Sequence, residues 1–221
     1  MAGVILFSSS TLPAAHNSMK LLGSLTSPYV RKVRVVLAEK KIDYEFEIAV
    51  PSEAGGPVRR HNPLARVPVL VLDDDSAIFD SPVIVEYLDN AAPNNKLLPQ
   101  PSRERIEVKR REALADGLLD AAVSARMESL RPDGERSAGW IERNRIVIVH
   151  CLECMARELG ENAWCLGTHF GLADIAAGCA LGYLDLRFPD IDWRSAHPNL
   201  DRLHEKLMQR PSFAETVPPR A

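Results

Sequence analysis

Two hydroxyl side chains stand where a short apolar segment meets the start of a predicted helix. Residues 24–34 read SLTSPYVRKVR, so Thr26 and Ser27 directly precede a proline and an apolar-periodic segment. The unpaired amides and the dipole of a helix N-terminus stabilise negative charge. Lowering a thiol pKa by about two units requires the thiolate to be stabilised by roughly 2.7 kcal/mol relative to the thiol. One hydroxyl hydrogen bond and a helix terminus together can supply a stabilisation of this size. The segment therefore fits a bound thiolate, although Ser and Thr most often stand here only to cap the helix.

A second polar site is predicted at the end of residues 62–82, NPLARVPVLVLDDDSAIFDSP. Residues 67–72 form an apolar β-branched run, and residues 77–79 predict an antiparallel strand that returns after an acidic turn. Ser81 is a predicted N-cap and Pro82 a predicted first helical residue. A capping hydroxyl and free helix amides would then meet at one place, where a ligand carboxylate can bind.

The sequence RVPVL, followed by FDSPVIVEYL, resembles the glutathione-binding half of glutathione transferases. The resemblance implies that the Val67–Pro68 peptide is cis and pairs with the cysteinyl backbone of glutathione. It also implies that Asp80 and Ser81 hold the γ-glutamyl end, and that Arg66 faces the glycine carboxylate. Without the resemblance, Arg66 is equally well interpreted as a solvated surface arginine, and the segment as a hairpin and helix of an unrelated α/β domain.

The segment TSPYVRKVR resembles the active-site segment of bacterial glutathione transferases, and Ser27 aligns with the first cysteine of the Cys-Pro-aromatic-x redox motif of related thioredoxin-fold proteins. Val30 occupies the position of the last cysteine, and the N-terminal half has no cysteine. Disulfide exchange by the protein itself is therefore not expected. We expect the hydroxyl of Ser27 to donate to the sulfur of bound glutathione, with Thr26 as the competing candidate.

The N-terminal half predicts a small mixed sheet with helices on its faces, because strand and helix patterns alternate. The resemblance implies a thioredoxin-like domain over residues 19–92. The predicted strands are 20–23, 44–50, 67–72 and 77–79, and the predicted helices are 29–41, 58–61 and a third that starts near 81.

Everything after a proline-rich linker at residues 93–101 is predicted to be helical. The fold class expected is an α/β thioredoxin-like N-terminal domain followed by an all-α helical-bundle C-terminal domain over residues 102–221. Helices are predicted at 102–130, 137–159, 172–186 and 198–209, and the inner face of the first is predicted to use Ile106, Leu114, Leu118, Ala121 and Ala125.

The electrophilic substrate implied by the family would lie between the two domains, against the first long helix. This surface is what varies within the family. The residues predicted to line it are Asp116, Leu119, Asp120 and Val123.

Two further motifs are interpreted as structural. Gly171 and Asp174 resemble a helix-capping motif of the C-terminal domain in which Ser or Thr usually occupies the glycine position. Cys151 and Cys154 form a CxxC, but no second pair exists and the histidines make no ligand pattern, so no metal site is expected.

Composition excludes several classes of protein. The chain has 221 residues, a net charge of −3 and 46% hydrophobic residues, with charges of both signs interspersed. The chain lacks the basic excess that would predict nucleic-acid binding, and no apolar run reaches the ~20 residues of a membrane span. The four cysteines and the absence of a convincing secretory leader predict a location in the reducing cytoplasm. Residues 1–18 are predicted to be a disordered extension.

The predicted function is that of a glutathione transferase in detoxification, which adds the thiolate of reduced glutathione to a small hydrophobic electrophile. Glutathione acts as a co-substrate, no other cofactor is expected, and a homodimer is the expected state. Glutathione-dependent isomerisation or peroxide reduction at the same site is one alternative. A non-catalytic binding module is the other, but it would have no physical need of the Val67–Pro68 and Asp80–Ser81 pairs.

Overall fold

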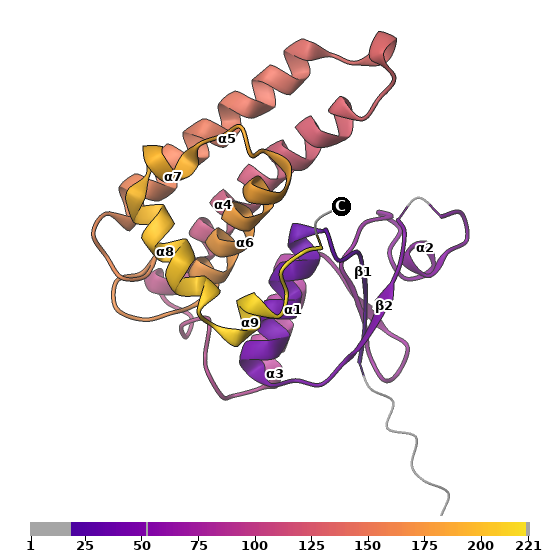
Figure 1. Ribbon diagram of the computed structural model, residues 1–221. Coiled ribbons are helices and arrows are strands. Elements are labelled where there is room, and N and C mark those ends of the chain that lie inside the picture. The colour runs from indigo at the N-terminus through magenta and orange to yellow at the C-terminus, as the bar shows by residue number, and fades with distance from the viewer. Residues whose placement is uncertain (1–18, 52, 220–221) are drawn as a thin grey trace, which may run out of the picture.

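The computed structural model describes residues 19–51 and 53–219, which form an N-terminal α/β domain followed by a helical domain (Figure 1). The predicted extension at residues 1–18 lies outside the described residues. The predicted fold class is confirmed. The elements are β1 (Lys20–Gly23), α1 (Pro28–Lys40), β2 (Glu45–Ile48), α2 (Pro57–His61), β3 (Val69–Val71), β4 (Ala77–Ile78), α3 (Ser81–Ala91), α4 (Arg103–Ser129), η1 (Asp133–Glu135), α5 (Ala138–Leu159), α6 (Leu172–Arg187), α7 (Trp193–Ala196), α8 (Pro198–Met208) and α9 (Pro211–Ala214).

The four strands make one mixed sheet in the order β2-β1-β3-β4. β1 pairs in parallel with β2, where Leu21 lies opposite Phe46, and antiparallel with β3, where Leu21 lies opposite Leu70. The parallel pair requires a crossover, which α1 supplies. The N-terminus of α1 consequently lies beside the end of β1, as the strand-helix pattern predicts.

Helices cover both faces of the sheet. α1 and α3 pack together on one face, over Leu21 and Leu70, and this apolar layer continues into the helical domain. The other face carries a smaller core that includes Leu22 and Val69 and is covered by Val58 of α2. Both faces of the short central strands are thus buried, which explains why residues 69–71 are an unbroken β-branched and leucine run.

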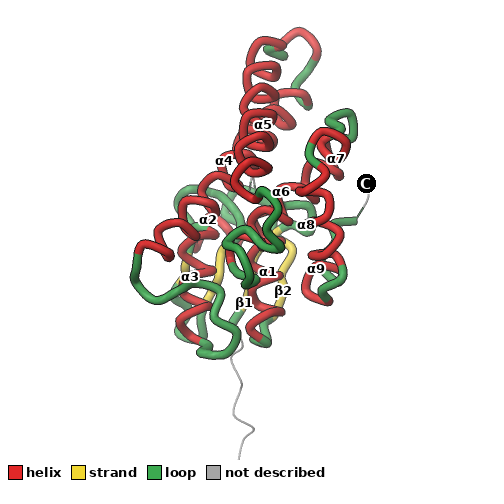
Figure 2. Tube along the Cα trace, turned by 90° about the vertical axis from the view of Figure 1, so that its left-hand side faces the viewer, coloured by secondary structure: helices red, strands yellow, loops and turns green. Residues whose placement is uncertain are grey.

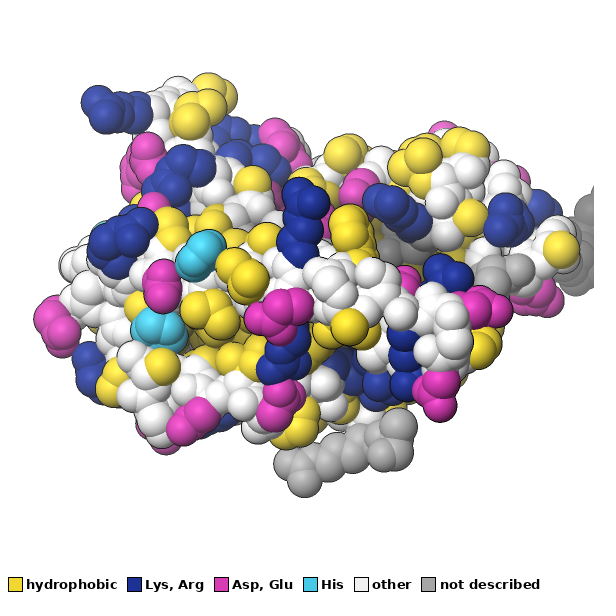
Figure 3. Space-filling view, turned by 90° about the horizontal axis from the view of Figure 1, so that it is seen from above, with side chains coloured by type: hydrophobic (Ala, Val, Ile, Leu, Met, Phe, Trp, Pro, Cys, Tyr) yellow, Lys and Arg dark blue, Asp and Glu magenta, His cyan; other side chains and the backbone are white. Residues whose placement is uncertain are grey.

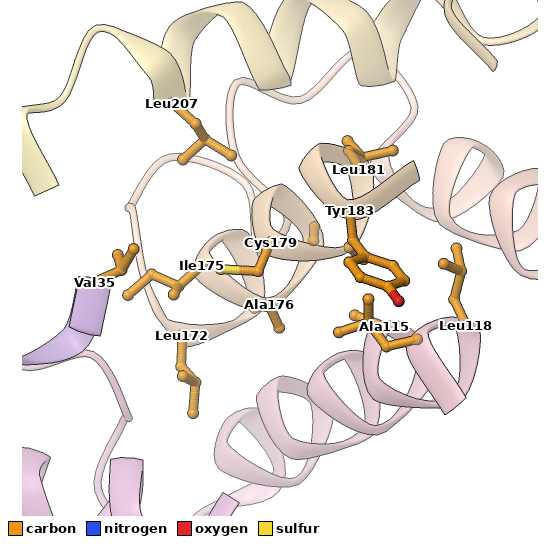
Figure 4. Packing of buried hydrophobic residues seen from close by; sticks show 14 of the residues in the cluster. Val35, Ala115, Leu118, Leu172, Ile175, Ala176, Cys179, Leu181, Tyr183 and Leu207 are labelled. Carbon is orange, nitrogen blue, oxygen red and sulfur yellow. The ribbon is translucent and has the colours of Figure 1, made fainter. Parts of the chain in front are cut away.

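The helical domain is organised around α6. Ile175 and Cys179 point toward Val35 of α1, while Tyr183 lies on the other side of α6, beside Leu118 of α4 (Figure 4). α6 is accordingly buried on all sides, as its apolar composition predicts. α4 and α5 form a long hairpin whose far end stands out from the rest of the molecule (Figures 1 and 2).

One sequence expectation about burial is wrong. Ile106, predicted on the inner face of α4, is 65% exposed, while Leu118, Ala121 and Ala125 are buried as predicted and Leu114 is half-buried. The first turn of α4 lies outside the helical core, so the same face of the helix is buried only further along.

Hydrogen bonds hold the segment between α3 and α4 in place, although it contains no helix or strand. The buried carboxylate of Asp89 accepts from the amides of Leu97 and Leu98. Lys40, buried at the end of α1, donates to Asp89 at 3.0 Å and to the carbonyl of Asn94. The predicted linker is therefore fixed to both α1 and α3.

The capping motif of α6 keeps its acidic half. Asp174 accepts from the amide of Gly171 at 2.9 Å and from the amide of Cys165 at 2.7 Å. A Cβ atom at Gly171 would lie 3.1 Å from the carbonyl oxygen of Leu97, which also accepts from the amide of Leu172. The close approach of the preceding segment explains why glycine replaces the usual Ser or Thr.

Candidate functional site

The first part of the site is the N-terminus of α1. Ser27 is the N-cap, and its Oγ accepts from the amide of Val30 at 3.4 Å. The capping role is therefore present. Because the oxygen is the acceptor in this bond, the hydroxyl proton of Ser27 can still donate to a ligand.

Thr26 has a different environment from its neighbour. Its Oγ1 lies 3.1 Å from Oγ of Ser24, and its amide donates to the same Ser24 oxygen at 3.3 Å. The Thr26 hydroxyl is thus already paired within the turn before α1. This geometry favours Ser27 over Thr26 as the hydroxyl that faces a sulfur.

The second part of the site is the loop before β3. The Val67–Pro68 peptide is cis, as the family resemblance implies, and Pro68 is buried while Val67 is half-buried. Asn62 donates to the carbonyl of Arg66 at 2.9 Å and so fixes the backbone just before the cis peptide. The side chain of Arg66 is exposed, and its contact with the glycine carboxylate of glutathione stays a prediction.

The third part is the N-terminus of α3, where one prediction is corrected. The N-cap is Asp80, whose carboxylate accepts from the amide of Ser81, so Ser81 is the first helical residue and Pro82 the second. A carboxylate competes successfully for the cap position because it is also stabilised by the helix dipole. The Ser81 hydroxyl is consequently released from capping; it is 1% exposed and has no hydrogen-bond partner among the described residues.

The predicted electrophile-binding residues of α4 divide into two groups. Asp116, Asp120 and Val123 are half-buried or exposed, and they lie on one face of the helix because they are spaced by four and three residues. Leu119 does not belong with them. Its side chain is fully buried in the core, where a ligand cannot contact it. The prediction that Leu119 lines the electrophile site is therefore corrected.

Tyr29 brings this face of α4 to the first part of the site. Its hydroxyl donates to the carboxylate of Asp120. Burial raises the pKa of Tyr29 well above its usual value, and the Asp120 hydrogen bond and the charges of Asp120, Asp116 and Asp80 raise it further. Tyr29 is therefore a neutral hydrogen-bond donor at any ordinary pH.

A buried lysine lies beneath the same face and was missed by the sequence prediction. Lys32 is 0% exposed and donates to Glu112 at 3.0 Å and to both oxygens of Asp116, at 2.9 and 2.6 Å. Burial opposes its charge, but Asp116 and Glu112 outweigh burial and raise its pKa. In the sequence, Lys32 stands between the apolar residues of α1, and nothing in the local pattern marks it as buried. Only the helical domain, which covers this side of α1, reveals its role.

The cysteines do not form a second site. Burial raises the pKa of Cys151, and burial together with Glu158 raises the pKa of Cys154. Burial also raises the pKa of Cys179 to about 11. Within the described part of the chain, no group of three or more His, Cys, Asp or Glu residues has a geometry that could hold a metal ion. Because their pKa values are raised, the thiols of Cys151, Cys154 and Cys179 are neutral at pH 7.

The surface around these elements is mixed in charge. Lys and Arg side chains alternate with acidic and hydrophobic ones on the face seen in Figure 3. None of the described helices combines the length and the apolar character that a membrane crossing requires.

Similarity to known proteins extends over both domains. Residues 21–96 match the N-terminal domain of glutathione S-transferases, and residues 138–206 match their C-terminal domain. An uncharacterized GST-like protein of Escherichia coli, YibF, is 41% identical over 92% of this chain and 100% of its own length. A maleylacetoacetate isomerase of Pseudomonas aeruginosa is 28% identical over 90% of this chain and 96% of its own. A glutathione S-transferase crystal structure from Methylobacillus flagellatus, with glutathione bound, has a TM-score of 0.88 and 48% identity, covering 91% of this chain and 100% of that one.

Proposed function

The chain belongs to the glutathione S-transferase family, and from this premise we propose that it binds reduced glutathione and transfers its thiolate to a hydrophobic electrophile. Glutathione would lie across the N-terminal domain, with its γ-glutamyl end at Asp80 and Ser81 and its cysteinyl backbone at the Val67–Pro68 peptide. Its sulfur would then lie at the N-terminus of α1, beside Ser27.

The Ser81 hydroxyl is the observation that carries this proposal. A buried hydroxyl without a partner costs roughly 1 to 3 kcal/mol, so its presence at the N-terminus of α3 needs a reason. The α-carboxylate of a bound γ-glutamyl group would supply the missing partner, and the helix amides would add to its stabilisation. Asp80, which is exposed beside it, is the natural partner of the α-ammonium group.

Calorimetric titration with glutathione tests the γ-glutamyl site. Ser81→Ala should weaken glutathione by about fivefold to a hundredfold, because a ligand charge loses its partner. The unliganded variant should be at least as stable as the wild type, because it loses a buried hydroxyl that makes no hydrogen bond within the described protein. Ser76→Ala is the matched control, since Ser76 is exposed on the β3–β4 turn and, among the described residues, its hydroxyl donates only to Asp74. Equal affinity in Ser81→Ala and Ser76→Ala would overturn the assignment.

Ultraviolet difference titration of the bound thiolate tests the catalytic residue. Ser27→Ala should raise the pKa of bound glutathione and lower turnover at pH 7 by about tenfold per pKa unit, and higher pH should restore much of the rate. Thr26→Ala should have the smaller effect, because the Thr26 hydroxyl is paired with Ser24. A pKa change in Thr26→Ala alone would reverse the two roles.

Glutathione-dependent isomerisation is the second candidate, supported by the 28% identity to a maleylacetoacetate isomerase. An isomerase adds the thiolate to a double bond and releases it again after rotation, whereas a transferase consumes glutathione. The amount of free thiol left after complete turnover therefore distinguishes the two reactions.

The wider setting follows from the same family membership. We propose a homodimer, in which the exposed apolar residues Val83, Tyr87 and Ile106 at the junction of α3 and α4 supply part of the contact. Arg105 pairs with Glu86 across this junction, which places the three residues on neighbouring turns. All four cysteines are free thiols, which supports a location in the cytoplasm, where glutathione is kept reduced. A role in detoxification would follow from the proposed transfer of glutathione to electrophiles.

A further inference from the structure

The hydrogen bond from Tyr29 to Asp120 joins the two domains at the proposed sulfur site. Tyr29 follows Ser27 by two residues on α1, and Asp120 is exposed on α4. This pair therefore lies between the position proposed for the thiolate and the face of α4 proposed for the electrophile.

The charges near this pair are unbalanced. Lys32 is enclosed by Glu112 and Asp116, so its positive charge is already neutralised below the surface. Within residues 19–51 and 53–219, neither Asp120 nor Asp80 has an ion pair with Lys, Arg or His. The next cation along α4 is Arg126. Its charge is directed instead at Tyr183 of α6, where it partly offsets the burial that raises the pKa of Tyr183.

The same face of α4 becomes apolar beyond Asp120. Val123 is half-buried and Met127 is 61% exposed, and helical spacing of three and four residues places both in line with Asp120. An electrophile that reaches the thiolate from this side would contact a carboxylate close to its reacting carbon and apolar side chains further out.

We propose that Asp120, oriented by Tyr29, selects the electrophile by charge, admitting neutral or cationic apolar compounds and rejecting anionic ones. This inference rests on the proposed transferase function and specifies its substrate class. Like charges at close range repel, so an anionic substituent near Asp120 weakens binding. Maleylacetoacetate is a dicarboxylate, so the same charge disfavours the isomerase alternative.

Calorimetry with preformed conjugates tests the selection without requiring turnover. Two S-aryl glutathiones serve as probes, whose nitrophenyl rings bear either a carboxamide or a carboxylate group para to sulfur. The wild type should bind the carboxamide conjugate about tenfold more tightly than the carboxylate conjugate. Asp120→Asn should bring the two affinities to within about twofold of each other. Tyr29→Phe should reduce the preference without abolishing it, because the charge of Asp120 remains while the hydrogen bond that orients it is lost.

Glu104→Gln is the matched control, because Glu104 is an exposed carboxylate on the same helix about 24 Å away along its axis. It should retain the wild-type preference. Equal affinities of the two conjugates in the wild type, or an unchanged preference in Asp120→Asn, would overturn the charge selection alone. Failure of unmodified glutathione to bind would overturn the proposed function, and the charge selection with it.

Discussion

Replacing Lys32 by Met should destabilise the protein strongly, because the ammonium group is buried against two carboxylates. The side chain of Lys32 is 0% exposed, that of Glu112 is 2% exposed and that of Asp116 is 15% exposed. Met preserves most of the side-chain volume but removes the charge and three hydrogen bonds. The two carboxylates are then left without their buried cation.

Removing one partner of a buried ion pair typically costs about 3 to 5 kcal/mol. The lower end applies here, because Glu112 keeps Lys109, whose Nζ lies 2.8 Å from Oε2, and because Asp116 can be reached by water. A loss of about 3 kcal/mol corresponds to a fall of roughly 6 to 12 °C in Tm for a chain of this size.

Urea unfolding at one fixed protein concentration measures this difference, and Lys109→Met is the matched control. Lys109 bonds to the same carboxylate but is 30% exposed, so its loss should cost less than about 1 kcal/mol. Because the folded-state pKa of Lys32 is raised, its contribution is fully present below its unfolded pKa and is lost as the pH rises through its folded pKa. The difference should therefore be constant between about pH 7 and 9 and shrink above about 10.5. Equal losses in Lys32→Met and Lys109→Met at pH 7 would refute the reasoning.

Three further outcomes are expected. Gly182→Ala should lower the unfolding free energy by about 1 to 3 kcal/mol, because the added Cβ would lie 2.3 Å from Nη1 of the buried Arg31; a neutral result in thermal unfolding would mean that Arg31 relocates without cost. Asp174→Ala should cost about 2 to 4 kcal/mol in urea unfolding, because two backbone amides lose their acceptor, and a loss below about 1 kcal/mol would show that water replaces it. Tyr87→Glu combined with Ile106→Glu should convert the expected dimer to a monomer in sedimentation, and a wild-type monomer at micromolar concentration would contradict the dimer.

The sequence predicted well those features that are encoded locally. Strand and helix order, the proline-marked loop before β3 and the cap of α1 at Ser27 all follow from periodicity and turn chemistry over a few residues. The cap of α3 was misplaced by one residue because Asp80 and Ser81 are both good N-caps, and only the backbone geometry decides between them. The short helices α7 and α9 were not predicted, since four residues carry too little periodicity.

The features that depend on contact between domains could not be predicted. Arg31 and Lys32 stand between apolar residues of α1, a pattern typical of a solvated face, yet both are buried because α6 covers that side of the helix. Ile106 shows the reverse, since its position in the α4 pattern is apolar but none of the elements in the described part of the chain covers it. The hydrogen bond from Tyr29 to Asp120 joins residues far apart in the chain and has no local pattern at all.

Burial of α1 on opposite sides explains how the two halves of the site are positioned. Val33 and Leu37 hold the helix within the N-terminal domain, which also carries the proposed glutathione contacts at α3. Lys32 instead fixes the distance between α1 and α4, and thus between the proposed sulfur position and Asp120. A rigid second set of contacts is what holds two functional groups at one separation. Loosening the Lys32 contact should therefore change the binding of the aryl part of a conjugate much more than the binding of glutathione itself. Equal effects of Lys32→Met on glutathione and on its conjugates would mean that α1 moves as a whole, and that α4 does not set the geometry of the electrophile site independently.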